Sequence, residues 1–111
     1  MKPIALPGSF DDLDLRVGRV TSVEEARTRK PTYRLTIDLG PELGIKRSCG
    51  ALRNYAPGDL VGRLVVAAVN LGPKQMGPEI SEVLVLGAVN SRGEVIYLTP
   101  ESDVPIGAAV F

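Results

Sequence analysis

Apolar and polar residues alternate with a period of two along several short segments of this chain, and that pattern predicts β-strands with one buried face. The clearest example is YRLTIDL, in which every second residue from Tyr33 to Leu39 is apolar and the residues between them are polar. A similar alternation runs through DLRVGRVTSVEEA, residues 14–26. Gly18 lies inside that segment, where a missing side chain suits a bend or bulge of the strand.

Two more strands are expected in the middle of the chain. A turn at residues 41–44 leads into IKRSC, which is predicted to be a strand with Lys46 on the face opposite Ile45 and Arg47. The segment RLVVAAVNL, residues 63–71, is almost continuously apolar. A strand of that composition is typically buried on both faces.

The last part of the chain predicts a hairpin, and two short segments predict helical turns. EVLVLGAVN and GEVIYLT are expected to pair through the turn at residues 91–93. The piece ALRNY, residues 51–55, is expected to be helical and to be stopped by Pro57 and the glycine after it. Ser9 is expected to cap one helical turn at residues 10–13.

Several short strands with one short helix in the middle predict an all-β fold, a small closed barrel of the oligonucleotide-binding (OB) type. No repeat, low-complexity tract or linker divides the chain. We therefore expect one domain over residues 10–111, preceded by an N-terminal extension over residues 1–9.

Composition adds an expectation about assembly and location. The chain has 111 residues, of which 44% are hydrophobic and 23% charged. A chain of this length buries only roughly two-thirds of its unfolded surface, so part of the apolar surface is expected to meet a second copy of the chain. No apolar run approaches the roughly 20 residues that cross a bilayer, and no secretory leader is recognised at the N-terminus. The sequence predicts a cytoplasmic protein without membrane insertion.

The residue types argue against an enzyme. Cys49 is the only cysteine and the chain has no histidine, which excludes an intramolecular disulfide, the usual zinc sites and a Cys–His nucleophile. No glycine-rich phosphate loop leads into a helix, and the carboxylates show no paired spacing. We expect no catalytic residue, no metal and no cofactor, and we interpret Cys49 as a packing residue.

Charge is distributed unevenly, although the formal net charge is zero. Between Arg16 and Arg53 the chain carries nine cations and four anions, whereas both flanking segments are net negative. A locally positive face of this kind attracts a polyanion, although an ordinary solvated surface would have the same composition.

Several separated motifs carry a resemblance to a known family. DLDLRVGRV, then VVAAVNLGPKQMGPEISEVLVLG, then VIYLTPESDVPIGAAV resemble, in this order, the tRNA-binding domain family, which includes stand-alone tRNA-binding proteins and the C-terminal appendix of many methionyl-tRNA synthetases. The segments KPTYRLTIDLGPELGIKRS and SEVLVLG look most like the CsaA branch, whose members are described as export-related chaperones. The similarity covers about residues 10–111.

The resemblance implies a homodimeric OB barrel whose loop after the long apolar strand contacts RNA. Asn70, Lys74 and Ser81 stand at the matching positions of that loop, NLGPKQMGPEIS. Lysine offers a point charge to a phosphate, while Asn and Ser offer neutral hydrogen bonds. Asn70 could equally bond the local backbone and end its strand, and Ser81 could equally start the next one.

Two functions from different classes are left open. The first is a tRNA-binding module that grips structured tRNA through its backbone, using Lys74 together with Arg34, Lys46 and Arg47; the carboxylates of Glu79 and Glu82 would oppose this binding. Extensive base stacking is not expected, because the chain has three tyrosines and no tryptophan.

The second is a chaperone that receives extended segments of unfolded or precursor proteins, with the protein-export machinery as a further expected partner. Its groove would lie near Leu71, Met76 and Ile80, because methionine adapts to varied apolar partners. For the homodimer, the expected self-complementary interface consists of apolar residues near the two ends of the chain: Ile4, Leu6, Phe10, Leu13, Ile106, Val110 and Phe111.

Overall fold

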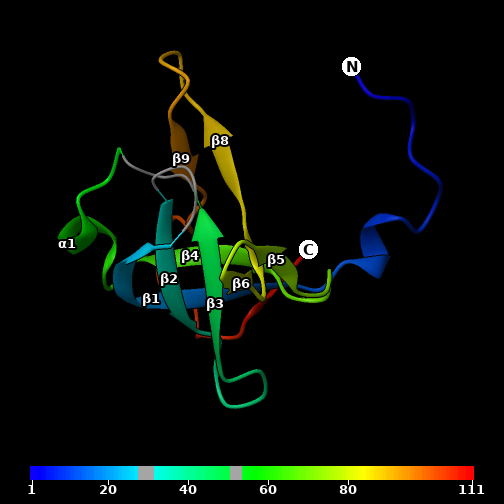
Figure 1. The fold of residues 1–111 in the computed structure, drawn as a ribbon. Coiled ribbons are helices and arrows are strands. Elements are labelled where there is room, and N and C mark those ends of the chain that lie inside the picture. Colours follow the sequence, from blue (N-terminus) through cyan, green and yellow to red (C-terminus); the bar gives the residue numbers. More distant parts are fainter. Residues whose placement is uncertain (28–31, 51–53) are drawn as a thin grey trace.

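A computed structural model describes residues 1–27, 32–50 and 54–111 (Figure 1). It consists mostly of strands, with one 3-10 turn and one short helix. In chain order the elements are η1 (Phe10–Asp12), β1 (Leu15–Ala26), β2 (Thr32–Asp38), β3 (Ile45–Gly50), α1 (Pro57–Leu60), β4 (Leu64–Ala68), β5 (Lys74–Met76), β6 (Glu79–Ser81), β7 (Leu84–Val85), β8 (Gly87–Val89), β9 (Val95–Tyr97) and β10 (Ala109–Val110).

The main sheet has the antiparallel order β3-β2-β1-β4-β7, and β10 is added beside the start of β1. The long strand β1 serves two neighbours in succession: its first residues pair with β4 and its later residues pair with β2. A strand that changes partners along its length curls the sheet towards closure. The expected barrel-like, all-β fold of the OB type is confirmed.

The core lies inside the curled sheet and follows the predicted pattern. Alternate residues of β2 are buried from Tyr33 to Leu39, and all five residues of β4 are buried. Leu60 of α1 and Val83, next to β7, complete the same cluster. The alternating strand and the continuously apolar strand were therefore both interpreted correctly from the sequence.

The irregularity in β1 is not at Gly18, where the sequence suggested it. Gly18 pairs in register with Val65, and the register shift lies between Val20 and Ser22. Gly18 is instead a point of close packing, since a Cβ atom there would lie 2.5 Å from Cγ2 of Ile37. The missing side chain leaves room for the core side chains Ile37 and Leu39, and the pairing with β4 runs through Gly18 without a register shift.

The helical turn predicted at residues 10–13 is present as the 3-10 turn η1, whereas its predicted cap and the described part of the helix predicted at residues 51–55 need correction. Residues 51–53 of the expected helix lie outside the described residues, and Asn54 and Tyr55 form a turn and a bend. The helix begins at Pro57, because proline fits the first turn, where backbone N–H groups have no helical partner. Ser9 caps nothing at η1: its own backbone is helical, and its hydroxyl donates back to the carbonyl of Leu6 at 2.7 Å.

Two segments project from the barrel. The predicted final hairpin is present as the ribbon β8–β9, although its first strand divides at Leu86, whose N–H still donates to Val66 of β4. Residues 1–13, named the N-terminal arm from here on, are exposed throughout and extend away from the barrel (Figure 1). Within the described ranges, neither helical segment is long and apolar enough to cross a membrane.

Candidate functional site

The connection between β4 and β7, residues 69–83, is a folded hairpin and not an open loop. β5 and β6 pair antiparallel, with Lys74 opposite Ser81 and Met76 opposite Glu79. Gly77 makes the turn with φ of +61°, a conformation that glycine adopts without strain. The side-chain amide of Gln75 donates to the carbonyl of Gly77 and tightens the turn.

A hollow of about 540 Å³ lies beside this hairpin. That volume falls within the roughly 300–1,000 Å³ of ligand pockets in proteins. Most of its exposed lining is apolar, and its residues come from the start of the hairpin and from the segment after it: Leu71, Gly72, Pro73, Lys74, Gln75, Ser81, Val83 and Leu84. We name it the hairpin hollow.

Lys74 is the cation of the hairpin hollow. Its side chain is exposed, and over the part of the chain that the structure describes no carboxylate forms an ion pair with it. An exposed, uncompensated ammonium beside an apolar hollow can meet an anionic group of a ligand without first breaking an internal bond.

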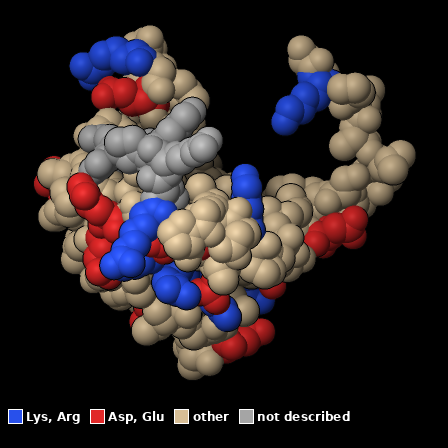
Figure 2. Space-filling view, in the orientation of Figure 1, with Lys and Arg blue, Asp and Glu red and all other residues tan. Residues whose placement is uncertain are grey.

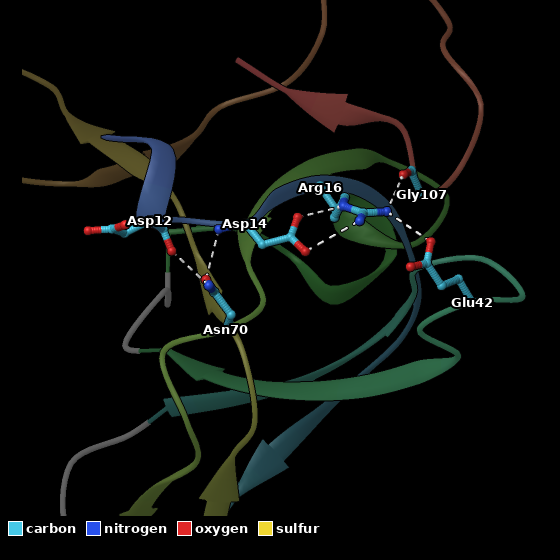
Figure 3. Close-up of polar contacts among 6 residues, drawn as sticks. All are labelled: Asp12, Asp14, Arg16, Glu42, Asn70 and Gly107. Carbon is cyan, nitrogen blue, oxygen red and sulfur yellow. Dashed lines mark hydrogen bonds and ion pairs between the residues drawn. The ribbon is translucent and has the colours of Figure 1, made fainter. Parts of the chain in front are cut away.

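Asn70 holds the chain before β1 through its side-chain amide (Figure 3). Its Oδ1 accepts from the backbone N–H of Asp14 at 2.8 Å, and its Nδ2 donates to the carbonyl of Asp12 at 2.9 Å. Of the two interpretations left open, the contact to backbone is what the structure shows. The partners lie 56 and 58 residues earlier in the chain, however, and not in the local turn.

Ser81 lies at the seam where the sheet closes. Its Oγ accepts from the backbone N–H of Cys49 at 3.1 Å and donates to the carbonyl of Val83 at 3.1 Å. Ser81 also lines the hairpin hollow. Of the three residues that the resemblance places at the ligand, only Lys74 therefore has a polar group that no described hydrogen bond or ion pair uses.

Arg34 is fastened to the hairpin. Its Nη1 lies 3.1 Å from both carboxylate oxygens of Glu79, and its Nη2 lies 3.2 Å from Glu24. Only 5% of Glu79 is exposed, and Glu79 also accepts from the backbone N–H of Arg27. That backbone hydrogen bond, followed by the bond from Arg34, holds the pKa of Glu79 below its usual value.

Arg47 and Lys46, on β3, are more available than Arg34. The Arg47 side chain is 49% exposed, and its ion pair with Glu82 is long, at 3.7 Å. Lys46 is half-buried. The carboxylate of Glu82 also accepts a hydrogen bond from the backbone N–H of Arg47, at the edge of β3. Glu79 and Glu82 thus neutralise neighbouring arginines.

Positive and negative side chains are mixed on the face of the molecule that Figure 2 shows, where blue and red side chains lie next to each other. Arg16, for example, is paired with Asp14 and Glu42. Arg29, Lys30 and Arg53 belong to the predicted basic half and lie outside the described residues.

The three apolar residues predicted for a peptide groove do not share one face. Leu71 is 55% exposed and lines the hairpin hollow, which includes neither Met76 nor Ile80. Ile80 is 41% exposed and lies opposite Gln75, whereas half-buried Met76 lies opposite buried Glu79. The alternation of faces along a strand separates them. Leu84, which is 53% exposed, is an apolar wall that the sequence interpretation missed.

The residues predicted for a self-complementary interface fall into two groups. Those of the N-terminal arm and the last residue are exposed, namely Ile4, Leu6, Phe10, Leu13 and Phe111. Ile106 and Val110 are half-buried, and Val110 packs against Leu15 and its neighbours. An apolar hollow of about 500 Å³ lies beside β10, with Val66, Leu98, Val110 and Phe111 among its walls.

The tyrosines pack in the core or against one another, and Cys49 is partly buried. Tyr33 is buried, and the rings of Tyr55 and Tyr97 stack with their centres 5.9 Å apart. Burial raises the pKa of Tyr97. Burial also raises the pKa of the Cys49 thiol, with a smaller contribution from Glu79. Across the described residues, no group of three or more His, Cys, Asp or Glu side chains could hold a metal ion.

Comparison with known proteins identifies a family model and solved structures that are similar to this chain. Residues 15–109 match the family model described as "Putative tRNA binding domain". The chain is 43% identical to the chaperone CsaA of Bacillus anthracis, whose crystal structure superposes with a TM-score of 0.91 over 98% of this chain and 100% of that one. It is 36% identical to the CsaA chaperone protein of Picrophilus torridus, also with a TM-score of 0.91, over 97% of this chain and 100% of that one.

Curated relatives are much longer proteins. The chain is 36% identical over 103 residues to the methionine–tRNA ligase of Methanocaldococcus jannaschii, covering 91% of this chain and 15% of the ligase. It is 40% identical over 102 residues to that of Archaeoglobus fulgidus, again covering 91% and 15%. The chain therefore corresponds to about a seventh of each of these two ligases.

Proposed function

The chain belongs to the tRNA-binding domain family and is close to its CsaA members, and from that membership we propose that it binds structured tRNA as a homodimer, through phosphate contacts made at the hairpin hollow. The proposal contains no catalytic step. Ligase activity is a property of relatives of which this chain covers about 15%. We place the protein in the cytoplasm, where tRNA is found.

The observation that carries the proposal is the state of Lys74. It is exposed at the hairpin hollow, and none of the described carboxylates pairs with it. The nearby carboxylates of Glu79 and Glu82 are held by Arg34 and Arg47, so they oppose a phosphate less than their positions in the sequence suggest. Arg47 and Lys46 offer further cations on β3, while Arg34 is committed to Glu79.

Contacts to the tRNA backbone, and not stacking on bases, fit the side chains present. The tyrosines are engaged in the core or with each other, and sequence-tolerant stacking needs exposed rings. Cations and neutral donors recognise phosphate and ribose by position. A tRNA is larger than one barrel of this size, so two copies would double the number of phosphates in reach.

The homodimer is supported by apolar surface that one copy leaves exposed. Ile4 is 92% exposed, Leu6 80% and Phe111 104%. An arm with such side chains gains free energy by burial against another apolar surface. The apolar hollow beside β10 contains Phe111 and is of a size to receive side chains of this kind. We propose that the arm and the C-terminal residues of two copies cover each other.

The test of tRNA binding is a charge reversal at the hairpin hollow. We expect Lys74→Glu to weaken tRNA binding by at least the roughly 1 kcal/mol of a hydrogen bond to a charged group, with an unchanged melting temperature. Lys74→Gln should reduce the slope of log K against log salt concentration by about one. Arg92→Glu, at the tip of the β8–β9 ribbon, is the matched control, since it makes the same charge change on another projection. Equal effects of Lys74→Glu and Arg92→Glu would remove Lys74 from the site.

A second candidate function, binding of extended apolar segments of unfolded or precursor proteins, is favoured by one observation. The hairpin hollow is walled by Leu71, Pro73, Val83 and Leu84, and two similar structures are named chaperones. Salt separates the two functions, because polyanion binding weakens steeply with salt and apolar binding does not. A Leu84→Asp variant that loses peptide binding but keeps tRNA binding would establish the second function beside the first. Partners in protein export are part of this second proposal only.

A further inference from the structure

Asn70 joins two parts of the molecule that the proposed function uses. It directly precedes Leu71, the first residue of the hairpin hollow. Its amide spans the backbone of Asp12 and Asp14, at the root of the N-terminal arm, with bonds of 2.9 Å and 2.8 Å. Both ends of one short, stiff side chain are therefore engaged, and the root of the arm, at Asp12 and Asp14, cannot leave its position without breaking two hydrogen bonds.

The same polar network continues to the C-terminal residues (Figure 3). The carboxylate of Asp14 accepts from Arg16 at 2.6 Å, and Arg16 in turn donates to the carbonyl of Gly107 at 3.2 Å. Gly107 lies two residues before β10, which pairs with the start of β1. One chain of contacts thus links the residue beside the hollow, the root of the arm and the turn that leads to the last strand.

We infer that Asn70 is a positioning residue: it holds the N-terminal arm in the direction needed for self-association, and it affects tRNA binding through the arm and not by contact with RNA. The inference rests on the proposed function. It differs from what the resemblance implies, because a ligand contact by Asn70 would compete with the bonds to Asp12 and Asp14.

A consequence is that the two kinds of binding are linked. A ligand that stabilises the position of Leu71 also stabilises the bonds of Asn70 to the arm, and so favours self-association. By thermodynamic reciprocity, self-association then favours ligand binding by the same factor. The linkage passes through the hydrogen bonds of Asn70 to Asp12 and Asp14, so a substitution at Asn70 or at Asp14 should weaken it.

The experiment disrupts the hydrogen bonds between Asn70 and the root of the arm by changing either Asn70 or Asp14. Asn70→Ala removes the amide. Asp14→Pro removes the N–H that Oδ1 of Asn70 accepts from, and the extended backbone of Leu13 is compatible with a following proline. Asp14→Pro also removes the carboxylate that pairs with Arg16, and Asn70→Ala changes a residue next to the hairpin hollow, so each variant needs a control. Asp14→Ala keeps the N–H but loses the pair with Arg16, and Lys74→Ala changes the hollow without touching the arm.

Three measurements are made on each full-length variant: the melting temperature, the dimer dissociation constant by sedimentation equilibrium, and tRNA affinity. We expect Asn70→Ala and Asp14→Pro to weaken self-association and tRNA binding together, by about tenfold or more for tRNA, because linked sites lose their mutual effective concentration. Asp14→Ala should have the smaller effect. Lys74→Ala should weaken tRNA binding and leave self-association of the unliganded protein unchanged.

A double-mutant cycle separates positioning from contact. In a background whose dimer is broken by Phe10→Asp and Phe111→Asp, adding Asn70→Ala should change tRNA affinity by less than about twofold. An equal loss in both backgrounds would mean that Asn70 touches RNA, and would overturn the inference while leaving the proposed function intact. A parent protein that neither dimerises nor binds tRNA would instead overturn the proposed function. If Asn70→Ala unfolds, Asp14→Pro carries the same comparison.

Discussion

The hydroxyl of Ser81 accepts a hydrogen bond at 3.1 Å from the backbone N–H of Cys49, on the outer edge of β3. Beside it, the carboxylate of Glu82 accepts from the N–H of Arg47 at 3.1 Å, and the N–H groups of Glu82 and Val83 both donate to the carbonyl of Arg47. Side chains and backbone of residues 81–83 thus satisfy the edge of β3 in place of another strand. The curled sheet is closed at this seam.

Removal of the Ser81 hydroxyl should therefore lower stability. Ser81→Ala leaves the N–H of Cys49 without its partner, which costs about 1–3 kcal/mol when such a group stays buried. Ser81→Thr keeps the hydroxyl and should recover most of the loss. Urea unfolding at equilibrium measures both. If Ser81 instead acts chiefly on a phosphate or ribose, Ser81→Ala will retain the parent's stability and lose tRNA affinity.

Acid should weaken the attachment of the hairpin through Glu79. The folded-state pKa of Glu79 lies below its ordinary value of 4.5, so its contribution to stability is fully present above about pH 4.5 and is lost as the pH falls through the folded-state pKa. We expect Glu79→Gln to lower the melting temperature at pH 7, with a difference from the parent that shrinks steadily below pH 4.5.

Calorimetry from pH 7 down to pH 3 checks this expectation. Glu101→Gln, which removes one exposed carboxylate far along the chain from Arg34, is the control for a general change in net charge. A difference between parent and Glu79→Gln that stays constant across this range would contradict the assignment.

Arg34 and Arg47 should separate stability from ligand binding. Arg34→Met leaves the buried carboxylate of Glu79 without its ion pair, and we expect a clear fall in melting temperature, of roughly 5 °C or more. Arg47→Met affects a half-exposed side chain with one long ion pair, so its cost to stability should be small. For tRNA binding the order reverses: Arg47→Met should lower the salt slope by about one. Equal slopes for the two variants would contradict this order, and a slope lowered by about one in both would show that Arg34 leaves Glu79 for the ligand.

Gly18 of β1 should not tolerate an added side chain without cost. A Cβ atom there would lie 2.5 Å from Ile37 and 2.7 Å from Leu39, both of which are fully buried. Gly18→Ala should therefore destabilise by about 1–3 kcal/mol, as overpacking does. Gly58→Ala is the matched control, because nothing lies within 4 Å of a Cβ at that position. Chemical denaturation of both variants measures the difference, and equal stabilities would show that the core yields to an added methyl.

The barrel could be predicted from the sequence because local patterns specify it. The period-two alternation from Tyr33 to Leu39 and the unbroken apolar run of β4 each fix which faces are buried, whatever the rest of the chain does. The segment of the β5–β6 hairpin was recognisable by resemblance, and Lys74 is an exposed cation without a described ion pair, as its residue type suggested. Helix-breaking residues were less informative. Pro57 was expected to stop a helix and instead begins one, because proline is found both after the end of a helix and in its first turn.

Tertiary structure alone decided how the polar residues are used. Asn70 and Ser81 have several hydrogen-bonding groups that suit RNA or backbone equally, and their partners, Asp14 and Cys49, lie 56 and 32 residues away in the chain. The availability of Arg34 and Arg47 for a ligand likewise depends on Glu79 and Glu82, because the folded hairpin brings these carboxylates into ion pairs with the two arginines. Apolar periodicity is a property of one segment, whereas the partner of a polar group is set by which segments the closed sheet places side by side.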